Sequence, residues 1–147
     1  MWNAKKSVML SLICNRFVMA AVVAVGFGTP WLVNSYVAYL DKRPEVAQPL
    51  MVTLLGCCIV AFIALWCLDR LLRNIREDQV FIRENVILLR RISWCCFGVA
   101  LILFCSYYYL FFLIAGIAAA FIGLILRVVK NVIEEAIVLK HENDLTI

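Results

Sequence analysis

The chain has 147 residues, of which 65% are hydrophobic and 16% charged, and its mean hydropathy is +0.96. An average soluble domain is roughly 45–50% apolar and about 25% charged, so this composition all but excludes a soluble globular domain. The formal net charge of +4 is explained by contact with anionic lipid at a membrane surface and gives no reason to expect direct binding of nucleic acid.

Three stretches lack any charged residue, and each is longer than the roughly 20 residues that a membrane-spanning helix needs. They are residues 17–40, 46–68 and 92–126. Their apolar residues are continuous, whereas the strands of a membrane barrel would alternate in polarity. The expected fold class is therefore all-α, an integral membrane four-helix bundle.

The first span is expected over about residues 14–40, continuing past Pro30, and the second over about 48–70. Arg16 interrupts the N-terminal apolar stretch, which disfavours a secretory signal peptide. The connector that follows, residues 70–91, has apolar residues at helical spacing with charged residues between them. We expect the second span to run on as a helix, a break near Asp78 and Gln79, and a new helix that leads into the third span.

The last uncharged stretch would be about 52 Å long as one helix, well beyond a hydrocarbon core of about 30 Å. It is expected to form two spans, about residues 89–107 and 110–129, joined by a turn at 106–109 whose tyrosines favour the membrane boundary. A cytoplasmic helix over 130–142 should follow. The whole chain, 1–147, would then be a single membrane domain.

The basic residues predict how the chain is threaded through the membrane. Of the 14 Lys and Arg residues, all except Lys42 and Arg43 fall on one side of a four-span arrangement. Because Lys and Arg collect on the cytoplasmic side, both termini are expected in the cytoplasm.

Small residues recur at steps of four in two of the expected spans, a spacing that lets helices approach closely in lipid. The candidate packing residues are Ala20, Ala24 and Gly28 in the first span and Ala115, Ala119 and Gly123 in the fourth. The spacing leaves open whether they pack within one chain or between two copies, so a homo-oligomer is an open alternative.

The residues needed for catalysis, metal binding or ion coupling are scarce. The seven cysteines include two adjacent pairs, at 57–58 and 95–96, rather than the C-x-x-C pairs of redox sites, and His141 is the only histidine. We interpret the cysteines as small apolar filler and expect no metal or cofactor. The uncharged stretches hold no ionisable residue of the kind that ion-coupled transport uses. No nucleophile, base and orienting group come together, so we expect no catalytic residues and no enzyme.

Several short motifs carry a resemblance: Asn74-Ile75, the segment F-I-R-E-N-V-I-L-L-R-R-I-S (81–93), Glu135-Ala136-Ile137 and the E-N-D-L-T-I tail (142–147). The chain resembles a family of small, uncharacterised four-span membrane proteins of Gram-positive bacteria. The resemblance implies a bacterial plasma membrane and a gene often beside a small helix-turn-helix regulator of the Cro/CI type. It brings no catalytic residue, and the turn at 77–81 lacks the Gly and Pro expected in the family.

The charged segments suggest what the chain does. We expect a membrane-embedded interaction or regulatory protein that presents a charged cytoplasmic face to a protein partner; the alternative is a small transporter or channel subunit that acts as an oligomer. The alternative for the connector is that it is a membrane-surface segment with a solvated charged face and does not dock a partner. The candidate interaction residues are Arg83, Glu84, Asn85, Arg90, Arg91, Glu134, Glu135, Glu142, Asn143 and Asp144. Arg83, Arg90 and Arg91 are expected to pair with Glu134, Glu135 and Glu142, in competition with the partner.

Overall fold

The computed structural model describes residues 4–40, 44–106 and 109–146. Its elements are α1 (Ala4–Tyr39), a short 3-10 helix η1 (Pro44–Val46), α2 (Ala47–Arg76), α3 (Arg83–Cys105) and α4 (Leu110–Leu145). In this part of the chain four helices are long and apolar enough to cross a membrane, which confirms an all-α chain with four span-like helices. Lys42 and Arg43, predicted for the first outer loop, and Tyr107 and Tyr108, predicted for the second turn, lie outside the described residues.

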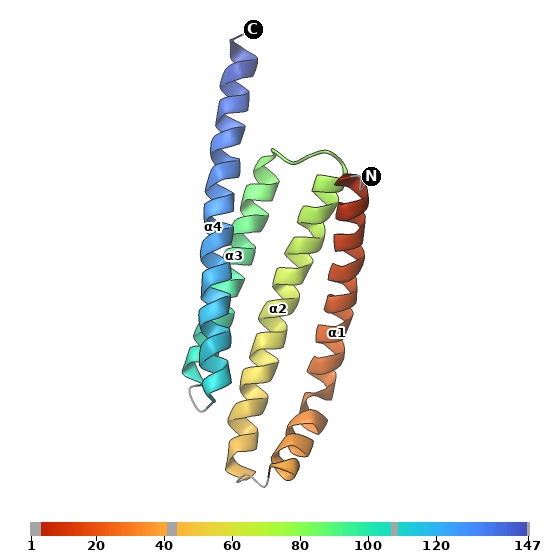
Figure 1. The fold of residues 1–147 in the computed structure, drawn as a ribbon, viewed down its shortest axis with the longest axis vertical. Coiled ribbons are helices and arrows are strands. Elements are labelled where there is room, and N and C mark those ends of the chain that lie inside the picture. Colours follow the sequence, from red (N-terminus) through yellow and green to blue (C-terminus); the bar gives the residue numbers. More distant parts are fainter. Residues whose placement is uncertain (1–3, 41–43, 107–108, 147) are drawn as a thin grey trace.

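The helices form a row in which each packs on its neighbour in the chain: α1 on α2, α2 on α3 and α3 on α4 (Figure 1). Within the described residues α1 and α4 share no comparable packing face, so the row is more open than the predicted bundle. Successive helices run antiparallel. The start of α1, the α2–α3 turn and the end of α4 therefore lie at one end, at the top of Figure 1. We call this the charged end (residues 5–16, 69–91 and 127–146).

Polar side chains join neighbouring helices along the row. Asn15 of α1 donates a hydrogen bond from Nδ2 to the carbonyl oxygen of Leu65 in α2, at 3.1 Å. Ser93 of α3 donates from Oγ to the carbonyl oxygen of Gly123 in α4, at 2.8 Å. Each bond joins a side chain of one helix to the backbone of the next, so both help to fix the register of adjacent helices.

Two glycines allow α4 to approach α3 closely. A Cβ atom on Gly123 would lie 3.2 Å from the Cβ of Cys96, and one on Gly116 would lie 3.0 Å from the ring of Phe104. Both contacts are tighter than side chains normally tolerate, so the helix spacing here depends on glycine. The two glycines are seven residues apart, two helical turns, and so lie on one face of α4.

The six small residues predicted to pack between helices are only partly buried. Of the six, Gly123 is buried, while Gly28 and Ala119 are half-buried. Ala20, Ala24 and Ala115 are exposed, so no other part of the described chain covers them. The four-residue spacing correctly selected Gly123, but it selected the exposed Ala115 and not the neighbouring Gly116, which packs on α3. A spacing of small residues marks a line along a helix, but it does not show which of two adjacent lines faces another helix.

The best-packed part of the row lies near the charged end. Its buried cluster is formed by side chains of α2 and α3, with Leu126 and Ile133 of α4 packed against it; the cluster is Cys67, Leu71, Leu88, Leu89 and Ile92. In contrast, large aromatic side chains such as Phe27 and Phe111 are 86% and 83% exposed. Such exposure is expected where the surrounding solvent is lipid.

Candidate functional site

The turn between α2 and α3 is held by one buried amide. Asn85 is 1% exposed, and its Nδ2 donates to the carbonyl oxygens of Gln79 and Val80, both at 2.8 Å. Its Oδ1 accepts a hydrogen bond from Nδ2 of Asn74, also at 2.8 Å. Asn85 therefore fastens the turn to the last turns of α2 and the first turn of α3.

The backbone of this turn explains the predicted break. The helix α2 ends at Arg76 and α3 begins at Arg83, and Asp78 adopts a positive φ of 61°. Asp tolerates this left-handed conformation better than most residues, so the chain can turn here without Gly or Pro. Across the turn, Lys5 of α1 lies 3.2 Å from Asp78, with both side chains exposed.

Asn85 was predicted to lie on the interaction surface, but it is buried in the structure. A side chain that is 1% exposed is not accessible to a partner, and all three of its hydrogen bonds are made within the chain. Asn85 is thus a structural residue. The bond from Asn74 also links two separate motifs on which the family resemblance was based.

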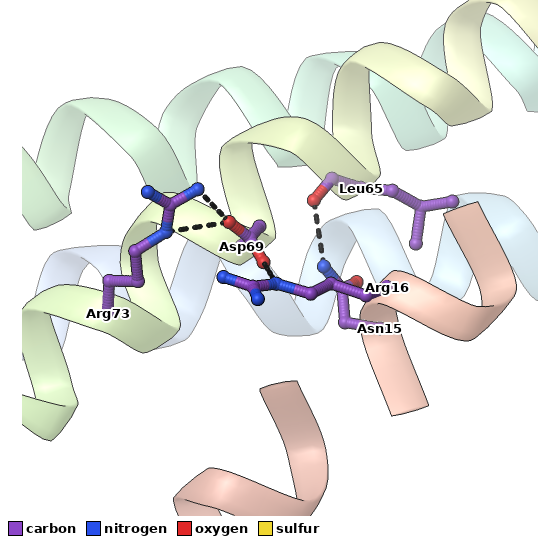
Figure 2. Close-up of polar contacts among 5 residues, drawn as sticks. All are labelled: Asn15, Arg16, Leu65, Asp69 and Arg73. Carbon is purple, nitrogen blue, oxygen red and sulfur yellow. Dashed lines mark hydrogen bonds and ion pairs between the residues drawn. The ribbon is translucent and has the colours of Figure 1, made fainter. Parts of the chain in front are cut away.

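A buried carboxylate, which the sequence analysis did not single out, joins α1 to α2 (Figure 2). Asp69 is 4% exposed. Its Oδ1 accepts a hydrogen bond from Nε of Arg16 at 3.2 Å and its Oδ2 one from Nε of Arg73 at 2.8 Å. Nη2 of Arg73 also bonds Oδ2. Figure 2 shows the two guanidinium groups on either side of this carboxylate, with Asn15 bonded to Leu65 beside them.

The sequence holds a signal for this cluster. Asp69 directly follows the uncharged stretch 46–68, and Arg73 comes four residues later, on the same face of the helix. A carboxylate at the edge of an apolar segment is stable when buried only if cations pair with it. In the sequence analysis Arg16 served as evidence against a signal peptide and as one of the basic residues on the cytoplasmic side, whereas in the structure it supplies the contact from α1.

Among the described residues, no ion pair joins Arg83, Arg90 or Arg91 of the connector to the C-terminal helix. Arg83, Arg90 and Glu134 line one groove of about 300 Å³, with apolar side chains of α3 and α4 between them. The ion pair of Glu134 is made with Lys130, at 2.9 Å. This ammonium, more than the two arginines, lowers the pKa of the Glu134 carboxyl below its usual value. Glu135 is exposed and does not line the groove.

The other predicted interaction residues lie around the charged end. Glu84 is half-buried and pairs with Arg70, with 2.6 Å between Oε1 and Nε. The remainder are exposed on α3 and α4: Arg91, Glu142, Asn143 and Asp144. They do not converge on one pocket, so together they form a charged surface and not a reaction centre.

The end of α4 continues past the first residue of α3, as Figure 1 shows. Ile137 and Val138 lie beside Arg83, where α3 begins, and the helix runs on to Leu145. We call residues 139–145 the C-terminal overhang. Its apolar side chains Leu139 and Leu145 are 59% and 74% exposed, and its polar residues are exposed around them.

Comparison with known proteins gives a family whose function is unknown. Residues 31–147 match the model of a family described as protein of unknown function, DUF2975. The matched region holds α2, α3 and α4, with Asp69, Asn74 and Asn85, while Arg16 precedes it. This confirms the resemblance to an uncharacterised family. No curated protein and no solved structure matches the chain.

Proposed function

The chain belongs to the family DUF2975, and we propose that it is a membrane-embedded regulatory protein that binds a cytoplasmic protein at its charged end. In this proposal it resides in the plasma membrane of a bacterium with both termini in the cytoplasm. Its role is binding and no catalytic step is assigned to it. The observation that carries the proposal is that the cations of the described helices and the C-terminal overhang lie at the same end of the row (Figure 1).

The distribution of charge supports the orientation. Apart from the outer loop, the Lys and Arg residues of the sequence precede α1's apolar part, surround the α2–α3 turn or follow residue 126. These three segments meet at the charged end. Because Lys and Arg near span ends favour the cytoplasmic side, this end is proposed to face the cytoplasm.

The overhang supports the choice of a protein as the partner. It presents exposed apolar and charged side chains on the segment of α4 that extends past the start of α3, an arrangement that suits docking onto a groove or a second helix. The small helix-turn-helix regulator implied by the family resemblance is the first partner to test.

The test is co-purification of the tagged full-length chain with that regulator from membranes in mild detergent. Charge reversal at both Glu134 and Glu135 should change the retention of the regulator. Retention is abolished if the glutamates bind a basic partner surface, and it is strengthened if they compete with the partner for Arg83 and Arg90. The matched control is Glu45→Lys, because Glu45 is exposed at the opposite end. Retention that is unchanged by the reversal, or reduced equally by the control, would contradict the proposal.

The alternative is a transporter or channel subunit, which the exposed Ala20 and Ala24 favour because they leave a small-residue face for a second copy. Labelling of Cys57 and Cys95 with a membrane-impermeant thiol reagent separates the two functions. Both residues lie within spans and are half-buried. Reaction at these depths would indicate an aqueous path and favour transport, whereas protection together with partner retention favours regulation.

A further inference from the structure

The two membrane-spanning helices nearest the C-terminus change from apolar to basic at the same level. The uncharged stretch 92–126 is flanked by Arg91 and by Arg127. Because α3 and α4 are antiparallel and Ser93 bonds the carbonyl of Gly123, the two flanks lie side by side. This level corresponds to the boundary between hydrocarbon and headgroups, where the phosphates of phospholipids are found.

A small basic pocket opens between the helices at this level. It has a volume of about 140 Å³ and is lined by Arg90, Ser93, Trp94, Arg127 and Lys130. The guanidinium carbon of Arg127 lies 5.7 Å from the centre of the Trp94 ring, a cation–π distance that helps to hold the arginine in place. The Ser93 hydroxyl is already committed to Gly123.

The charges around the pocket do not balance. Three cationic side chains line it, and the acidic residue paired with them is Glu134, which bonds Lys130. Lys130 is well fixed, since its side chain is only 14% exposed. Arg90 and Arg127 have no ion pair among the contacts of the described residues, although the charge of Arg90 also acts on Glu134 at longer range. Their planar N–H donors are therefore available to an anion. Arginine pairs in this way with phosphate oxygens in particular.

We propose that this pocket binds the phosphate group of an anionic phospholipid of the surrounding membrane. Arg90 and Arg127 donate to the phosphate oxygens, and Lys130 adds positive charge from the side of α4. On the apolar side of Arg127, the side chain of Leu124 is 53% exposed and gives an acyl chain a surface to follow. Basic pockets between spanning helices are a recognised kind of site for acidic headgroups.

Lipid is the preferred source of the phosphate because of the depth of the pocket. Its lining residues adjoin the uncharged stretch on both helices, so a bound phosphate would sit where lipid headgroups already concentrate. A soluble phosphate compound would have to reach the same level against that high local concentration. The inference concerns α3 and α4 alone and does not require the partner or the orientation proposed above.

The test uses the purified full-length chain in nanodiscs of phosphatidylcholine with increasing phosphatidylglycerol, and native mass spectrometry to count retained lipids. The double variant Arg90→Gln, Arg127→Gln removes two pocket charges. The matched control Arg91→Gln, Lys140→Gln removes two exposed charges from the same helices outside the pocket. We expect the wild-type chain and the control to retain one phosphatidylglycerol, and the pocket variant to bind it about tenfold more weakly for each arginine lost.

Equal weakening by the control would overturn the proposal, because it would show attraction to surface charge in general. Absence of any preference for phosphatidylglycerol over phosphatidylcholine in the wild-type chain would do the same. In a third arm, inorganic phosphate is added to discs that contain phosphatidylglycerol; displacement of the retained phosphatidylglycerol by millimolar phosphate would assign the site to a soluble anion instead. If the double variant fails to fold, the single variant Arg127→Gln with Lys140→Gln as control gives the same comparison.

Discussion

The buried amide of Asn85 makes a strong prediction about the stability of the α2–α3 turn. The substitution Asn85→Ala removes three hydrogen bonds, two to the carbonyls of Gln79 and Val80 and one from Asn74. The site is only 1% exposed, so water does not replace the lost partners while the turn keeps its conformation. The turn must either leave polar groups unsatisfied or open.

The magnitude follows from the bonds lost. Each intramolecular hydrogen bond contributes about 0.5–1.5 kcal/mol net. Three of them give about 1.5–4.5 kcal/mol. The lower part of this range is expected, because Gln79 is exposed and its carbonyl can regain water once the turn opens. Asn85→Asp should be worse, because an ionised carboxylate has no hydrogen to donate and would face two carbonyl oxygens.

The measurement is equilibrium unfolding in mixed micelles, together with limited proteolysis at the turn. We expect Asn85→Ala to lower the free energy of unfolding by the amount above and to expose the 77–82 segment to protease. Asn143→Ala serves as control, because Asn143 is exposed in the C-terminal overhang. A stability loss below about 0.5 kcal/mol would refute the argument, since surface substitutions already produce changes of that size.

Three further predictions follow from other contacts. Asp69→Asn keeps the shape of the side chain but removes the charge that its two arginines share, and should lower stability by about 1–2 kcal/mol in the same unfolding assay; no change would contradict an energetic role for the cluster. Gly123→Leu should separate α3 from α4 and cost on the order of 1–3 kcal/mol, whereas Ala115→Leu, at an exposed site, should be tolerated; equal thermal stabilities would be evidence against the close approach. Because Lys130 lowers the pKa of Glu134, the stabilisation from this pair is complete at neutral pH and is lost as the pH falls through the lowered pKa. Lys130→Gln should raise that pKa toward its usual value in a carboxyl NMR titration, and an unmoved pKa would disprove the pairing.

The sequence by itself determined the helices. Long uncharged stretches predict spanning helices because an unpaired backbone is costly in lipid, and only helices satisfy it within one segment. The break near Asp78 was also predictable, since apolar periodicity stops on one side of it and restarts on the other. The length of the last uncharged stretch required a fold-back, and α3 and α4 are the result.

The tertiary structure decided what the polar residues do. Asn85 follows two charged residues in the sequence, which is typical of an exposed segment, yet the packing of α3 on α2 buries it. Asp69 became a link between helices only when Arg16, 53 positions away, came within 3.2 Å. The basic pocket likewise depends on Arg90 and Arg127 meeting across an antiparallel pair. Local sequence fixes which segments are helical because hydrophobicity and backbone satisfaction act along the chain, whereas burial and charge pairing depend on distances in space that only the packed helices set.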